Sequence, residues 1–240
     1  MKYITIDNAK TTKGESSGYL TGILYLAPAN EAKQAGFNVP NACPFASAGC
    51  KAACLFTAGR GAFSNVREAR IRKSVELMGG KKWNEAPDAP RLEELAADIA
   101  ALVRKAKLEK KRPAVRLNGT SDYPVENWGL MEMFKSVQFY DYTKDHKKYL
   151  DYLEGKLPKN YHLTFSRSEN NGDTALDILR AGGQVAVVYK ELQNAIDYAR
   201  KAGVNVIDGD ANDLTFKAGA GVLALRAKGK AKKDVSGFVI

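Results

Sequence analysis

A regular alternation of apolar and amphipathic segments constrains the fold of this chain more than any other feature. Apolar runs rich in β-branched and aromatic residues are typical of buried strands, and they recur at residues 114–117, 138–142, 161–165, 185–189, 205–207 and 221–224. Helical spacing follows several of these runs, as at 128–135, 146–153, 174–180 and 192–202. Strands that alternate with helices predict parallel βαβ units with right-handed crossovers.

The first half of the chain extends this pattern. Residues 1–17 are weakly patterned and are expected to form a short strand and then a loop over 10–17, before a longer strand at 19–27. A loop follows, and helices are expected at 64–78 and 89–107. We therefore predict a single α/β domain over residues 1–240, built as a (βα) barrel or a partial (βα)6 barrel with parallel strands. A doubly wound open sheet is the alternative.

Polar residues that directly follow the predicted strands are the candidates for chemistry. Active sites of such folds lie at the carboxyl ends of the parallel strands. This rule selects a catalytic set consisting of Asp122, Asp141, Arg167, Lys190 and Asp208. An ordinary scaffold also carries polar loops at these places, so the pattern alone leaves each role open.

Three cysteines lie within twelve residues, on a loop that we assign to residues 28–62. Cys43, Cys50 and Cys54 have the spacing Cys-x6-Cys-x3-Cys, which is odd in number and clustered and so does not suit a disulfide framework. Thiolates are soft ligands for zinc, copper(I) and iron–sulfur clusters. No fourth local ligand is present, so the spacing predicts a three-thiolate metal centre with one open position. The alternative is three small buried side chains.

The charge of the chain points to a polyanionic partner. The net charge is +10 and the isoelectric point is about 9.4, which favours a nucleic acid, DNA rather than RNA, or a nucleotide. Arg60 is expected to hold a phosphate or carboxylate group beside the cysteines. The expected nucleic-acid contacts lie on one helix and on a basic tail at 226–240, and they are Arg67, Arg70, Arg226, Lys228, Lys230, Lys232 and Lys233. A solvated charged surface is the alternative for all of them.

Nothing in the sequence indicates a membrane protein or an exported one. No run of about 18 apolar residues appears, and the amino-terminal residues have no signal-peptide pattern. A cytoplasmic protein is therefore expected, while the sequence leaves the oligomeric state open.

Four segments of the sequence carry a family resemblance. Residues 41–60, 65–70, 116–122 and 227–238 resemble the gene product 88 family of bacteriophages. This resemblance implies a phage protein that acts in the cytoplasm of a bacterial host.

The layout also resembles that of radical S-adenosylmethionine enzymes. Those enzymes place three cysteines on a loop after the first barrel strand, where they hold a 4Fe-4S cluster, and a glycine-rich loop after the second strand contacts the cofactor. The resemblance implies cofactor contacts from Asn118, Gly119 and Ser121. The cysteine spacing departs from the usual Cys-x3-Cys-x2-Cys of that superfamily, which leaves zinc as the alternative metal.

Three functions are compatible with these features. The first is a phage enzyme that modifies a nucleobase or nucleotide with an iron–sulfur cluster and S-adenosylmethionine. The second resembles the guanine transglycosylases, zinc-bearing barrels in which an aspartate attacks the sugar and a 7-deazaguanine enters the DNA. The third is a non-enzymatic phage protein that binds nucleic acid through its basic tail. Metal content separates the first function from the second.

Overall fold

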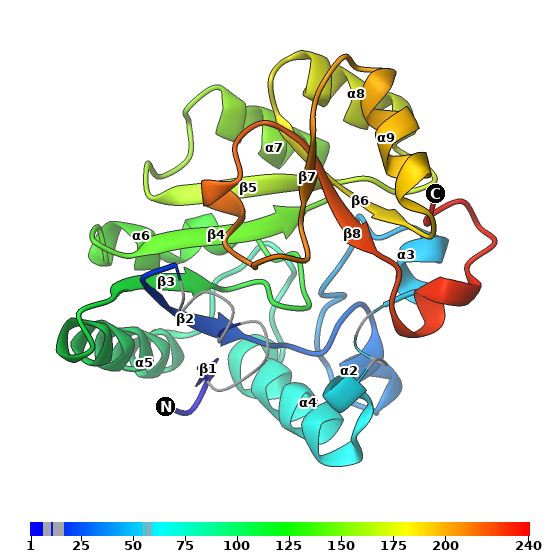
Figure 1. The fold of residues 1–240 in the computed structure, drawn as a ribbon. Coiled ribbons are helices and arrows are strands. Elements are labelled where there is room, and N and C mark those ends of the chain that lie inside the picture. Colours follow the sequence, from blue (N-terminus) through cyan, green and yellow to red (C-terminus); the bar gives the residue numbers. More distant parts are fainter. Residues whose placement is uncertain (7–10, 12–16, 55, 57–58) are drawn as a thin grey trace. The chain divides into compact units, whose positions relative to one another are not determined.

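The computed structural model describes residues 1–6, 11, 17–54, 56 and 59–240, and Figure 1 shows the elements of this part of the chain. The chain groups into two compact units. The first unit comprises Met1–Pro44, Phe63–Asp141 and Leu157–His162, and the second comprises Phe45–Ala62, Tyr142–Lys156 and Leu163–Ile240. The expectation of one domain over 1–240 stays a prediction.

The first unit contains the amino-terminal strands. They are β1 (Ile4–Thr5), β2 (Tyr19–Leu24), β3 (Arg112–Arg116) and most of β4 (Gln138–Thr143). β1 pairs with β2 in antiparallel register, whereas the β2–β3 and β3–β4 pairs are parallel. The short strand expected near the amino terminus is therefore present as β1. Most of the loop predicted at 10–17 lies outside the described residues.

Two helices of the first unit match the helical spacing of the sequence. They are α4 (Ser64–Met78) and α5 (Ala89–Leu108). The buried residues Leu95, Ile99 and Leu102 lie four and three positions apart, so they form one apolar face of α5. Gly22 of β2 allows this helix to approach closely, because a Cβ at that position would lie 3.1 Å from a methyl carbon of Leu102.

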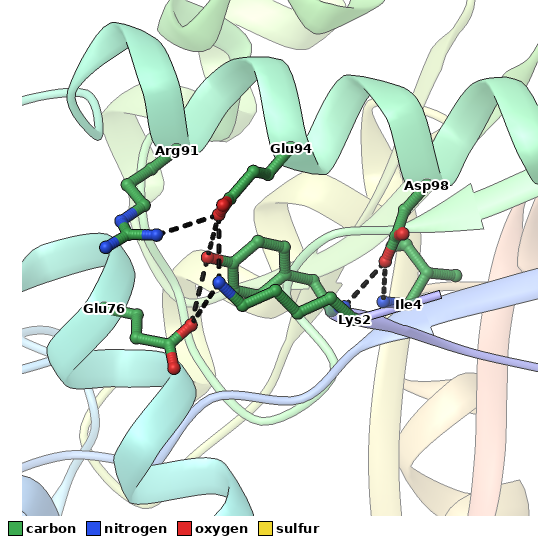
Figure 2. A network of polar contacts seen from close by, with 7 residues as sticks. Lys2, Ile4, Glu76, Arg91, Glu94 and Asp98 are labelled. Atoms are coloured by element: carbon green, nitrogen blue, oxygen red, sulfur yellow. Dashed lines mark hydrogen bonds and ion pairs between the residues drawn. The ribbon is translucent and has the colours of Figure 1, made fainter.

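A polar network fixes the amino-terminal strand to these helices (Figure 2). The buried carboxylate of Asp98 accepts the backbone N–H groups of Tyr3 at 2.6 Å and Ile4 at 3.0 Å. The ammonium group of Lys2 lies 3.0 Å from both Glu76 and Glu94. A two-residue strand has few ladder hydrogen bonds of its own, so the two hydrogen bonds to the carboxylate of Asp98 help to hold β1 in place.

The second unit contains the carboxyl-terminal strands and the longer helices that follow them. The strands are most of β5 (Tyr161–Ser166), then β6 (Gln184–Tyr189), β7 (Val206–Asp208) and β8 (Gly221–Arg226). The helices are α7 (His146–Leu153), α8 (Gly172–Arg180) and α9 (Leu192–Arg200). β8 lies between β6 and β7 and is parallel to both. The order of the strands in space therefore departs from their order in sequence at this one place.

Short helical segments connect the larger elements. They are α2 (Glu31–Gln34), α3 (Ala48–Ala52), α6 (Leu130–Met133) and the 3-10 helices η2 (Gly59–Ala62), η3 (Val125–Trp128), η4 (Thr215–Lys217) and η5 (Gly229–Lys233). The single helix predicted at 128–135 is wrong. Gly129 adopts a left-handed conformation with φ of 74° and separates η3 from α6, which ends the helix before it can extend.

The strand order identifies the fold class. The strands are hydrogen-bonded in the order β1-β2-β3-β4-β5-β6-β8-β7. From β2 to β6 each new strand adds on the same side as the one before, whereas a doubly wound sheet reverses direction. The protein is therefore an α/β protein with a mostly parallel sheet. The described sheet ends at β1 and β7 and is open, which is compatible with a partial barrel.

None of the helices in the described ranges is long and apolar enough to cross a membrane.

Candidate functional site

The loop after β3 is fixed by the side chain of one residue, Asn118. Its Oδ1 accepts hydrogen bonds from the Ser121 hydroxyl at 2.8 Å and from the Tyr123 backbone N–H at 2.9 Å. Its Nδ2 donates to the Tyr123 carbonyl oxygen at 2.9 Å. Asn118 is buried, so these bonds form away from water. Residues 118–123 are therefore held as a closed, preorganised loop at the carboxyl end of β3.

The buried charged pair of Asp141 and Arg116 supports this loop. The carboxylate of Asp141, near the end of β4, accepts the backbone N–H of Asn118 at 2.8 Å and the hydroxyl of Tyr161 at 3.2 Å. The Arg116 Nε lies 3.8 Å from the same carboxylate. Burial, and then the charge of Asp141, raise the pKa of Tyr161 well above its ordinary value. Burying such charges costs several kcal/mol, and groups of this kind gather at functional sites.

Cys43 joins the beginning of the cysteine loop to the loop after β3. Its sulfur accepts the Ala29 backbone N–H at 3.4 Å and lies 3.7 Å from the carbonyl oxygen of Thr120. The Asp122 backbone N–H donates to the Ala42 carbonyl at 2.8 Å. The first unit therefore brings together six of the sequence-predicted residues, namely Cys43, Asn118, Gly119, Ser121, Asp122 and Asp141.

Gly119 has a structural reason to be glycine. Its backbone N–H donates to the Leu24 carbonyl at 3.0 Å, and a Cβ at this position would lie 2.7 Å from that oxygen and from the Ile23 side chain. No real Cβ tolerates such a distance. The contact of Gly119 with a cofactor, which the radical-enzyme layout implies, stays a prediction.

The two other cysteines lie in the second unit, at either side of the end of α3. Cys50 is on the helix and is half-buried against a cluster made of Ala53, Ala227, Ala231, Phe238 and Val239. Cys54 follows the helix and is also half-buried. Positions 55, 57 and 58 of the 28–62 loop lie outside the described residues.

The metal centre stays a prediction. Among the residues that the structure describes, no group of three or more His, Cys, Asp or Glu side chains is placed to hold one metal ion. Cys43 belongs to the first unit, and Cys50 and Cys54 belong to the second. Neither unit alone therefore tests whether the three sulfurs converge.

Glu169, which sequence reasoning missed, fixes α3. Its carboxylate accepts the Ser47 hydroxyl and the Gly49 backbone N–H, both at 2.7 Å. Burial raises the pKa of Glu169, but these hydrogen bonds outweigh burial and lower it below its ordinary value. The available signal was an acidic side chain three residues after β5, a strand whose end the sequence placed one residue too early.

Arg167 and Lys190, which were predicted to be catalytic, hold the carboxyl-terminal segment. The Arg167 guanidinium donates to the carbonyl oxygens of Gly237 at 2.6 Å and Phe238 at 3.0 Å. The Lys190 ammonium donates to the Asp234 carbonyl at 2.7 Å. These observed contacts are structural, and a catalytic role for either residue stays a prediction.

Among the remaining candidates, Asp208, Arg60 and Arg67 are exposed, whereas Arg70 is half-buried. Asp208, the last residue of β7, is exposed and accepts the Asp210 backbone N–H at 2.8 Å. Arg60 is exposed on η2. Arg67 forms an ion pair of 3.2 Å with Glu31, and the Arg70 guanidinium lies 5.0 Å from the centre of the Tyr25 ring.

The predicted basic tail is an ordered part of the second unit. Ala227 and Ala231 are buried, and Lys228 pairs with Asp210 at 2.5 Å. Arg226, Lys230, Lys232 and Lys233 are exposed. The segment therefore presents cations from a fixed backbone, and their use in binding nucleic acid stays a prediction.

Comparison with known proteins identifies the family. The model of the Gene product 88 family matches residues 3–240, which include every candidate site residue. Searches of curated proteins and of solved structures found no significant match. The layout shared with radical S-adenosylmethionine enzymes therefore stays a prediction. The match over nearly the whole chain confirms the resemblance carried by the four segments, and the chain belongs to the Gene product 88 family of bacteriophage proteins.

Proposed function

We propose that this protein is a phage enzyme that modifies a nucleobase or nucleotide, with its chemistry at the carboxyl ends of β2, β3 and β4. One observation carries the proposal. The Cys43 thiol lies 3.7 Å from the Thr120 carbonyl oxygen, within a loop that rests on the buried carboxylate of Asp141. A thiol at the strand ends of a singly wound α/β fold occupies the place where such folds carry their chemistry.

The residues of this site have distinct roles in the proposal. Asp141 is buried and accepts hydrogen bonds from Asn118 and Tyr161, so we assign it to positioning the loop and not to nucleophilic attack. Asn118 and Ser121 keep the loop in one conformation, which reduces the entropic cost of holding a ligand there. Asp122 is buried in the same loop beside Ala42 and is the acidic residue best placed to act next to Cys43.

The donor chemistry of the cysteines supports a metal. All three thiols are half-buried, and as thiolates they suit an iron–sulfur cluster or zinc. When bound, a 4Fe-4S cluster with S-adenosylmethionine would supply one-electron chemistry, whereas zinc would stabilise the loop. Cys43, Cys50 and Cys54 would hold either of them.

Metal analysis tests the proposal. The protein is purified anaerobically, and iron, acid-labile sulfide and zinc are measured per chain for the wild type and for C43S, C50S and C54S. Loss of the same metal from all three variants supports one shared centre. Iron with sulfide favours the radical-type reaction, and zinc alone favours the transglycosylase-like reaction. A wild-type protein that contains neither metal would overturn the metal-dependent function.

A second candidate function is binding of nucleic acid through η5. The observation that favours it is the exposure of Lys230, Lys232 and Lys233 on a turn anchored by the buried Ala231. Each phosphate contact adds about 0.9 to the log–log salt slope of duplex DNA binding. The triple Lys→Gln variant at these positions should therefore reduce the slope by up to about 2.7.

The matched control removes the same charge elsewhere. Lys107, Lys135 and Lys201 are exposed lysines outside η5, and changing them to Gln should leave the salt slope nearly unchanged. If the two triple variants changed the salt slope equally, DNA binding would depend only on the net charge of the protein and not on η5.

A further inference from the structure

An open groove with mostly apolar walls lies in the first unit, between α5 and the segment that contains η3 and α6. Its volume is about 520 Å³. The wall opposite α5 includes Trp128, Leu130, Met133 and Phe134. Met133 is 65% exposed, so an apolar side chain stands at the surface beside an apolar hollow. Apolar surface that is gathered in one place in this way commonly marks a site where a partner binds.

The α5 side of the groove is built from small side chains. Ala96, Ala97 and Ala100 line it, and Ala97 is exposed. Helix axes lie 8–10 Å apart in proteins, and the distance depends on the side chains at the contact. Alanine keeps this distance short, because no larger side chain separates the two backbones. This face of α5 therefore suits close contact with another helix.

Two opposite charges flank these alanines on the same face of α5. Glu93 lines the groove and precedes Ala97 by four residues, and Arg104 follows Ala100 by four residues. The eleven residues from Glu93 to Arg104 make about three full turns, so both side chains leave the helix on one side, about 16 Å apart along its axis. Both are exposed, and within the described parts of the chain neither forms an ion pair.

The order of these charges is self-complementary. The point midway between Ala97 and Ala100 is also midway between Glu93 and Arg104. When two copies of α5 pack antiparallel about a two-fold axis through this point, Glu93 of each copy faces Arg104 of the other. A parallel pair would instead bring like charges together. The charges therefore favour a second copy of this chain as the partner.

We propose that the protein forms a two-fold dimer through this groove. α5 packs antiparallel on α5 of the second copy, and Glu93 and Arg104 of opposite copies form ion pairs at both ends of the contact. The flexible side chain of Met133 fills the groove of the other copy. The interface goes beyond the proposed function and uses none of the residues around Cys43, so the two proposals fail separately.

Analytical ultracentrifugation of the full chain tests the dimer at protein concentrations from about 1 to 100 μM. The average mass of the wild type should rise from 26.2 kDa towards twice that value. E93R and R104E should each weaken the dimer about tenfold or more, because each turns two attractive contacts into repulsive ones. The double variant E93R/R104E should recover the wild-type dissociation constant to within about threefold, since the same pairs form again with exchanged signs.

Net charge alone predicts a different result. The chain carries a net charge of +10, which E93R raises by two and R104E lowers by two. If two copies only repelled each other through net charge, R104E would strengthen the dimer, whereas the proposed contact requires R104E to weaken it. K201E is the matched control, because it removes the same charge at an exposed position of the second unit. It should not weaken the dimer.

Two further variants probe the apolar part of the interface. A97Q places a longer side chain where the helices meet, and M133Q makes the exposed apolar side chain polar. Each should weaken the dimer about tenfold or more. Both positions are exposed, so circular dichroism should show the wild-type fold in both variants. A wild type that stays at 26.2 kDa at every concentration would overturn the dimer and leave the groove to another partner. A dimer that R104E leaves as tight as the wild type would overturn the antiparallel contact.

Discussion

Replacement of Asn118 by alanine tests whether one side chain organises the loop after β3. The substitution removes three hydrogen bonds, two to Tyr123 and one to Ser121. A buried hydrogen bond contributes about 1 kcal/mol, so N118A should lower the free energy of unfolding by about 3 kcal/mol. S121A removes only one of the three bonds and should cost about 1 kcal/mol.

Thermal unfolding followed by circular dichroism measures both effects. For a protein of this length 1 kcal/mol corresponds to a Tm change of roughly 2–4 °C, so N118A should lower Tm by about 6–12 °C and S121A by about 2–4 °C. The comparison of the two variants carries the test, because both alter the same loop. If N118A lowered Tm no more than S121A did, the Asn118 side chain would not organise the loop and the reasoning would be refuted.

Two further predictions concern the second unit. Phe238 is 8% exposed and packs on α3, so F238A should cost about 3–5 kcal/mol in urea unfolding, whereas V235A, at a side chain 97% exposed, should change stability by less than about 0.5 kcal/mol. Burial raises the pKa of Glu169, but the hydrogen bonds from Ser47 and Gly49 outweigh it and lower the pKa below 4.5. The ionised Glu169 side chain therefore stabilises the folded protein above pH 4.5, and this stabilisation is lost as the pH falls through the folded-state pKa. The wild type should therefore exceed E169Q in stability near neutral pH, and the difference should shrink in acid. A difference that does not change with pH would contradict this role of Glu169.

The fold was predictable where local signals agree. Apolar runs and helical spacing located most strands and the long helices, because these elements bury a face that the sequence must keep apolar. The position of β8 between β6 and β7 was not predictable. All three strands are short and apolar, and which of them pair is decided by packing between residues far apart in the chain. Gly129 shows a second limit of prediction from sequence, because one residue in a left-handed conformation divides a helix that the apolar spacing alone would continue.

The candidate site was predictable only in part, because the sequence locates the strand ends but not the partners of the side chains there. The strand-end rule selected Asp122 and Asp141, the resemblance in layout selected Asn118, and the first unit brings the three together. It could not distinguish residues that face a ligand from residues that hold the backbone, because Arg167 and Lys190 occupy equivalent positions yet donate to carbonyl oxygens. Arg116 and Tyr161 were missed because they belong to apolar strands, where a charged or hydroxyl side chain gives no indication of its partner.

The insertion of β8 has a consequence for how the chain folds while it is being synthesised. In the described sheet β7 pairs with β8 and with no other strand. When β7 has just been synthesised, its partner in the described sheet does not yet exist, and 18 more residues must be added before β8 is complete at residue 226. At ordinary rates of translation this takes roughly 1–4 s. During that time the row of peptide groups on β6 that later pairs with β8 is open to other strands, so slow codons between residues 208 and 226 should increase aggregation of the nascent protein.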